Sequence, residues 1–76
     1  MINSKKLNLG SGNKIKADYL NLDFKQSEGV DLVHDLNIYP WPVNDSTFSE
    51  ILAENIIEHL DDFIPTMEEI YRVSSA

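Results

Sequence analysis

A short apolar segment that runs directly into a glycine turn constrains the fold of this 76-residue chain more than any other feature. The segment reads Leu7-Asn8-Leu9-Gly10-Ser11-Gly12. Glycine has no Cβ, so Gly10 and Gly12 can adopt positive φ and let the backbone lie close to a ligand. Eleven residues after Gly12, a second apolar segment ends in the carboxylate of Asp23. A glycine turn after one strand and an acid after the next indicate a nucleotide-type ligand, whose ribose diol the acid would hold.

The spacing of the apolar segments predicts four short strands and a C-terminal helix. About nine residues separate Leu9 from Tyr19, fewer than the dozen or so that a helical crossover between parallel strands needs. We therefore expect the first crossover to be a loop. Two prolines beside Trp41 exclude a regular element at 39–43, because they remove backbone donors. The expected strands lie at 6–9, 19–23, 30–35 and 48–53, followed by a short helical piece at 56–60 and a helix at 62–73.

The predicted C-terminal helix carries one apolar stripe. Asp61 and Asp62 stand at its start, where they suit the positive end of the helix dipole. Thr66 and Glu69 have the spacing of a capping box, but they lie inside the predicted helix and are not expected to cap it. The stripe consists of Phe63, Met67, Ile70 and Tyr71, at positions i, i+4, i+7 and i+8.

Charge argues against one class of function. The net charge is −7, and the basic residues concentrate in the first third of the chain. From Glu28 onward, eleven acids stand against Arg72 alone. Such a chain repels phosphate backbones, so direct nucleic-acid binding is not expected.

The size of the chain requires a further source of stability, because a domain this small buries only about 60% of its unfolded surface. The sequence has no cysteine, which excludes disulfides, and its two histidines do not suggest a metal site. Ligand binding and self-association remain as ways to bury more surface.

No apolar run approaches the ~18 residues of a membrane span, and the polar N-terminus contains no signal-peptide core. We therefore expect a cytoplasmic protein that does not enter a membrane.

Five segments of the chain together carry a family resemblance: 7–12, 21–23, 31–36, 39–42 with 46–51, and 56–60 with 67–73. In this order they resemble the N-terminal half of a class I S-adenosylmethionine-dependent methyltransferase. The closest likeness is to the subgroup whose first glycine turn runs almost directly into the second strand. The resemblance implies an α/β fold, a truncated Rossmann-like sheet of about four mostly parallel strands in the order 3-2-1-4 with a C-terminal helix. Residues 1–76 would then form a single partial domain, the cofactor-binding half.

The resemblance also implies a cofactor, S-adenosylmethionine, and a place for each of its parts. The backbone of the Gly10–Gly12 turn would lie against its amino-acid part. Asp23 would accept hydrogen bonds from the ribose hydroxyls, and Asp35 would face the adenine amino group, with the Leu36 backbone beside the ring. Glu54 and its two successors would line the mouth near the methyl group. The expected cofactor-binding residues are Asn8, Leu9, Gly10, Ser11, Gly12, Asp23, Asp35, Leu36, Glu54, Asn55 and Ile56.

Methyl transfer from a sulfonium group is an in-line displacement, which needs little from the protein beyond alignment. Two positions depart from the family pattern. Asn8 stands where many members carry an acid, and Lys14 where a third glycine is frequent. A family member would also continue into three more strands, so strand four is expected to be an open edge. We therefore expect a homodimer that pairs these edges and covers the helix stripe, with an unknown methyl acceptor.

Several residues admit a simpler interpretation than a role at the site. A nicotinamide cofactor would require a glycine at Ile15 and a later acid than Asp23. Asn55 to His59 is one histidine short of a zinc helix, so no metal is expected, and His59 is only a weak candidate for a general base. Trp41 and His34 are expected to be structural. A non-catalytic half-domain that self-associates, and binds ligand weakly or not at all, is the alternative to a methyltransferase.

Overall fold

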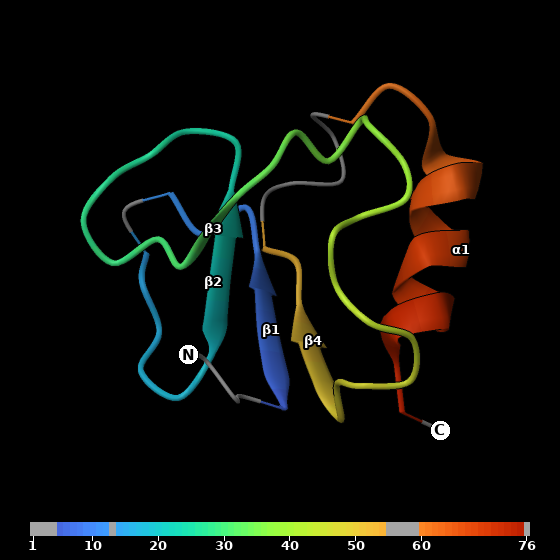
Figure 1. The fold of residues 1–76 in the computed structure, drawn as a ribbon. Helices are drawn as coiled ribbons and strands as arrows, with labels where there is room; N and C mark the ends of the chain where they lie inside the picture. The colour runs from blue at the N-terminus through green and yellow to red at the C-terminus, as the bar shows by residue number, and fades with distance from the viewer. Residues whose placement is uncertain (1–4, 13, 55–59, 76) are drawn as a thin grey trace.

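A computed structural model describes residues 5–12, 14–54 and 60–75 of the chain. Within them, four parallel strands form one sheet in the order β3-β2-β1-β4 (Figure 1). The strands are β1 (Lys6–Leu9), β2 (Leu20–Asp23), β3 (Leu32–Val33) and β4 (Glu50–Leu52), and a helix follows, α1 (Phe63–Val73). The sequence-based prediction of an α/β sheet with the order 3-2-1-4 and a C-terminal helix is confirmed.

The connections are as short as the spacing predicted. Residues 14–19 between β1 and β2 contain turns and no helix, so the first crossover is a loop. Strand β3 is shorter than the predicted 30–35 because the chain turns on both sides of it. Val30 N donates to Ser27 O before the strand, and Ile38 N donates to Asp35 O after it. The helical piece predicted at 56–60 lies outside the described residues except for Leu60, which is not helical.

One face of the sheet is apolar and forms the core. Leu7, Leu9 and Leu22 point to this face, since alternate residues of neighbouring parallel strands share a face. They pack with side chains from the segment between β3 and β4 and from the end of α1. The complete buried apolar cluster of the described residues is Leu7, Leu9, Leu22, Leu36, Trp41, Phe48 and Val73.

The other face of the sheet is polar and is covered by the first crossover. Asn8 and Asn21 are paired across β1 and β2, and both are buried. Asn8 Nδ2 donates to Asn21 Oδ1 at 2.9 Å and to Lys14 O at 3.1 Å. Asn21 Oδ1 accepts a hydrogen bond from Lys16 N at 3.0 Å, and Asn21 Nδ2 donates to Lys16 O at 3.0 Å. These bonds attach the loop to the sheet where a longer crossover would place a helix.

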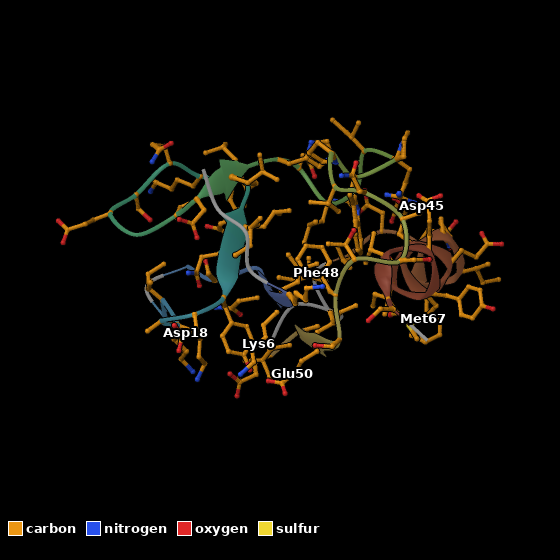
Figure 2. All side chains as sticks on the ribbon, turned by 60° about the horizontal axis from the view of Figure 1, so that its bottom comes forward. Lys6, Asp18, Asp45, Phe48, Glu50 and Met67 are labelled. Carbon is orange, nitrogen blue, oxygen red and sulfur yellow. The ribbon has the colours of Figure 1, made fainter. Side chains whose placement is uncertain are left out.

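Helix α1 lies on the β4 side of the sheet, with the segment 39–48 running between the two (Figures 1 and 2). Asp62 precedes the helix and caps it, because its carboxylate accepts Ile64 N at 3.2 Å. The predicted apolar stripe is covered only in part: Phe63, Met67 and Tyr71 are exposed, whereas Ile70 is partly buried against the core. The buried face of α1 instead consists of Thr66, Glu69 and Val73.

Trp41 occupies the space between α1 and the sheet and is structural, as expected. Its side chain is buried and stacks against Tyr39 with the ring centroids 6.2 Å apart. The indole Nε1 donates to Leu36 O at 3.0 Å, and the backbone N donates to Glu69 Oε1 at 2.7 Å. Tyr39 in turn lies 2.7 Å, hydroxyl to hydroxyl, from Thr66. The polar face of α1 is therefore buried because each of its polar side chains has a hydrogen-bond partner.

Arg72 fastens the segment that contains Trp41 onto α1. Its Nε and Nη2 donate to the two carboxylate oxygens of Glu69 at 2.7 and 2.8 Å. Its remaining donors reach Val43 O, Trp41 O and the carboxylate of Asp45. The Arg72 guanidinium holds the pKa of Glu69 below its usual 4.5, and the two carboxylates raise the pKa of Arg72. A bidentate pair of this kind is both stronger and more directional than a single ionic contact.

Replacing Glu69 with Gln should lower the stability of the fold in a pH-dependent manner. The lowered pKa of Glu69 stabilises the folded chain above pH 4.5, and this contribution is lost as the pH falls through the folded-state pKa. We expect Glu69→Gln to lower the free energy of unfolding by about 1.5–3 kcal/mol at pH 7. Urea unfolding at pH 7 and at successively lower pH measures this, and the difference between the two chains should shrink as the pH falls through the folded-state pKa of Glu69. The exposed neighbour Glu68→Gln is the control, and an equal loss from both variants would contradict the prediction.

Candidate functional site

The carboxyl ends of the four strands meet at one edge of the sheet, called here the carboxyl edge, which follows Leu9, Asp23, Val33 and Leu52. The chain proceeds from β1 to β2 and β3 on one side, then returns to place β4 on the other side of β1. The direction of winding therefore reverses beside β1. In open parallel sheets, ligands bind outside the carboxyl ends at such a reversal.

The predicted glycine turn lies at this reversal point, directly after β1 (Figure 1). Gly10 has φ 64° and Gly12 has φ 53°, the left-handed conformation expected of them. A Cβ added at Gly12 would meet no atom within 4 Å, so the space on that side of the turn is open. Glycine is thus required at Gly12 for its dihedral angle, and the turn leaves room for an incoming group.

Backbone amides in and after the turn already donate hydrogen bonds to carbonyls of the chain. Gly10 N and Ser11 N both donate to Leu22 O, at 2.8 and 3.2 Å, and Lys14 N donates to Ser11 O at 2.7 Å. These bonds hold the turn against the end of β2. A phosphate-type cradle of free amides is therefore not formed by Gly10, Ser11 and Lys14, and a ligand here has to be bound by other groups.

The hydroxyl of Ser11 is one such group. Ser11 is buried, and its Oγ has no hydrogen-bond partner among the described residues. Buried hydroxyls in folded proteins almost always have a partner, because an unsatisfied one costs about 1–3 kcal/mol. The Ser11 hydroxyl is therefore the one buried side-chain group of the described residues that lacks a hydrogen-bond partner.

Asp23 ends β2 next to the glycine turn. Leu22, the residue before it, receives the amides of Gly10 and Ser11, so the turn and the Asp23 backbone are neighbours. Asp23 is half-buried, and its backbone carbonyl accepts His34 N at 2.9 Å. No described residue donates a hydrogen bond to its carboxylate. The structure thus brings the backbones of the glycine turn and of Asp23 together at the carboxyl edge.

Asp35 and Leu36 lie further along the same edge, past β3. The Asp35 carboxylate is exposed and accepts Asn37 N at 2.9 Å, which closes a local turn. The Leu36 side chain belongs to the core, and its carbonyl accepts the Trp41 indole. Only Asp35 of this pair has a side chain exposed to an incoming ligand. His34 is structural, as expected, with Nε2 bonded to Ile38 O at 2.8 Å.

Other predicted site residues have internal roles or lie outside the described residues. Leu9 is in the core, and both amide hydrogens of Asn8 are used within the fold, so neither side chain contributes a donor to the site. Glu54 is exposed in the turn after β4. The candidates Asn55, Ile56 and His59 fall in the segment 55–59 and lie outside the described residues.

The part of the chain that the structure describes offers neither a cluster of metal-ligating side chains nor a membrane-spanning helix. It contains no group of three or more His, Cys, Asp or Glu side chains arranged to hold a metal ion. Across those same residues, α1 is too short and too polar for a transmembrane span.

Comparison of the chain with protein-family models, curated proteins and solved structures yields no match.

Replacing Ser11 with Ala should affect stability and ligand binding in opposite ways. Removing an unsatisfied buried hydroxyl should leave the free energy of unfolding unchanged or raise it by up to about 1 kcal/mol. If the hydroxyl binds a ligand, the same variant should lose about tenfold in affinity for that ligand. Urea unfolding and titration calorimetry on the same protein measure the two effects. A large loss of stability without any ligand would show that Ser11 has a structural partner.

Proposed function

We propose that the chain is the cofactor-binding half of an S-adenosylmethionine-dependent methyltransferase. The observation that carries the proposal is the buried, unpartnered hydroxyl of Ser11, in a left-handed glycine turn that is bonded to the end of β2, where Asp23 lies. The turn follows β1, beside which the winding of the parallel sheet reverses, and Asp23 ends the neighbouring strand β2. The sequence resemblance to class I methyltransferases supplies the identity of the ligand.

The residues of the carboxyl edge fit parts of this cofactor. Ser11 and the open side of Gly12 would contact its amino-acid portion, and the Asp23 carboxylate would accept hydrogen bonds from the two ribose hydroxyls. Asp35 would accept a hydrogen bond from the adenine amino group, and Glu54 would lie toward the methyl-bearing sulfur. When bound, the cofactor supplies an activated methyl group on sulfur. The chain contributes binding and alignment, and the methyl acceptor is unknown.

Asn8 gives the proposed site a distinctive property. Both of its amide hydrogens are directed at Lys14 O and Asn21 Oδ1, so the side chain is a fastening within the sheet. At this position it cannot provide the carboxylate that pairs with the cofactor's ammonium group in many family members. We therefore expect weak binding, governed by the ribose and adenine contacts.

The alternative is a non-catalytic half-domain that self-associates. The exposed apolar side of α1 favours self-association, since Phe63, Ile64, Met67 and Tyr71 have no cover within the described chain. A homodimer through the β4 edge and a cytoplasmic location remain predictions from the sequence. The two functions differ in whether an adenosine-containing ligand binds, which the following experiments measure.

Replacing Asp23 with Ala should weaken cofactor binding by about tenfold or more. The variant loses charge-assisted hydrogen bonds worth about 1.5–3 kcal/mol. Titration calorimetry of the unmodified chain with S-adenosylmethionine, and with its demethylated product, gives the reference affinity. Glu28→Ala, which replaces an exposed acid in the loop between β2 and β3, is the matched control and should bind like the unmodified chain. Absence of binding heat for both ligands at millimolar concentration would refute the proposed function and favour the non-catalytic half-domain.

Replacing Asp35 with Ala should lower affinity for adenosine-containing ligands with little effect on folding. Its carboxylate is exposed and closes only the turn at Asn37, so we expect the melting temperature to fall by no more than a few degrees. Ribose without the base should bind both chains equally. A large drop in melting temperature with unchanged affinity would identify Asp35 as a structural cap and remove it from the site.

A further inference from the structure

The side chain of Asn8 is buried beside the proposed site and reaches across the glycine turn. Asn8 is 4% exposed and lies in β1, two residues before Gly10. Its Nδ2 donates to Lys14 O at 3.1 Å, six residues later in the chain, and to Asn21 Oδ1 at 2.9 Å on the neighbouring strand. Asn8 therefore connects Lys14, which lies beyond the turn, to both β1 and β2.

The glycine turn depends on such bonds for its conformation. Gly10 has φ 64° and Gly12 has φ 53°, and glycine adopts positive and negative φ about equally readily. Local preference alone therefore does not hold the turn in the left-handed conformation. At its start, the amides of Gly10 and Ser11 are fixed by the carbonyl of Leu22. The far end of the turn needs a second attachment.

That second attachment is made through Lys14. Lys14 N donates to Ser11 O at 2.7 Å, within the turn, and Lys14 O accepts the bond from Asn8. Asn21 holds the loop two residues later, at the amide and carbonyl of Lys16. In the part of the chain that the structure describes, loss of the Asn8 bond would leave Lys14 bonded only to the turn itself. The turn would then be fixed to the sheet at its start and not at its end.

We propose that Asn8 is a positioning residue, which fixes the glycine turn in the conformation that receives the ligand and does not itself contact the ligand. The proposal rests on the proposed function for the identity of the ligand. The ordering of the turn by Asn8 is a property of the ligand-free chain and can be measured without it. Asn8 would then have a different role from the acid that many class I methyltransferases carry at this position.

The variant Asn8→Asp separates the two roles, because an ionised aspartate has acceptors and no donor. Its carboxylate would face Lys14 O and Asn21 Oδ1, which are both acceptors. Asn21 cannot rotate its amide to offer a donor, because its Oδ1 accepts Lys16 N and its Nδ2 donates to Lys16 O. The substitution therefore releases the turn. An acid that paired with the ammonium group of the ligand would instead strengthen binding.

Amide hydrogen exchange of the ligand-free chain, followed by NMR, measures the ordering of the turn. Asn8→Asp should speed exchange of the Lys14 amide at least about tenfold more than it speeds the slowest amides, which report global unfolding. Thr66→Val is the matched control, since it also removes two hydrogen bonds of a buried side chain, to Tyr39 and Asp62, but in α1. In this control the Lys14 amide should speed up no more than the slowest amides. The same result in Asn8→Asp would overturn the proposal.

Titration calorimetry with S-adenosylmethionine tests the direction of the effect on binding. Asn8→Asp and Asn8→Ala both remove the donor, so both should weaken binding at least about tenfold. Unchanged affinity in both variants would overturn the proposal. Tighter binding by Asn8→Asp would also overturn it, since residue 8 would then contact the ammonium group. Absence of binding by the unmodified chain would refute the proposed function, and the exchange measurement would still decide whether Asn8 orders the turn.

If neither variant folds, the side-chain amide hydrogens of the unmodified chain decide. Those of Asn8 are buried and bonded, whereas the side chain of Gln26 is exposed. Exchange at the Asn8 side chain should be at least about tenfold slower than exchange at the Gln26 side chain. Equal rates would overturn the proposal.

Discussion

The side chain of Asn21 is the fastening on which the polar face of the sheet depends. A parallel sheet has both faces buried, and the usual cover is a crossover helix on each face. The first crossover here has only residues 10–19, too few for such a helix. Asn21 replaces it by bonding to both the amide and the carbonyl of Lys16 and to the side chain of Asn8. Asp31 completes the network by accepting the Asn21 backbone amide at 2.8 Å.

A comparable polar fastening holds the opposite side of the molecule. Glu69 and Arg72 attach the segment around Trp41 to α1, and Trp41 in turn fills the core. In a chain with so few buried apolar side chains, hydrogen bonds to buried amides and carbonyls provide much of the specificity of packing. As a consequence, α1 presents its polar side to the interior, and the apolar side chains of Phe63, Met67 and Tyr71 are exposed to solvent.

The positions of the strands and of the helix were predictable because they follow from local patterns, whereas the strand order was predicted from the family resemblance. Short apolar runs, a glycine turn and the spacing between Leu9 and Tyr19 limit the sheet to parallel strands with minimal crossovers. The inner face of α1 was not predictable in this way. Thr66 and Glu69 face inward because Tyr39 and Trp41, far away in the sequence, provide partners for them. Helical periodicity identified the apolar stripe but carries no information about which side those partners occupy.

The candidate site divides along the same line. Gly10, Gly12 and Asp23 were identified because a turn and a strand end are local signals. The role of Asn8 was not, since its partners lie on the neighbouring strand and in the loop. A signal for it was nevertheless present, as Leu7-Asn8-Leu9 and Leu20-Asn21-Leu22 repeat one alternating pattern in two strands that pair in register. Two asparagines at equivalent positions of adjacent strands indicate a hydrogen-bonded pair on a buried face.

The fastening of the loop also determines how a ligand would act on the fold. Lys14 is held twice, by its carbonyl to Asn8 and by its amide to the carbonyl of Ser11. The loop over the polar face and the turn that carries the Ser11 hydroxyl are therefore one connected unit. A ligand that binds Ser11 and Asp23 would bind only the folded arrangement of this loop and turn. Its binding would therefore raise the free energy of unfolding of the chain. A small chain without disulfides has a small core and would gain stability from such a ligand. Occupancy of the carboxyl edge and the stability of the fold would then depend on each other.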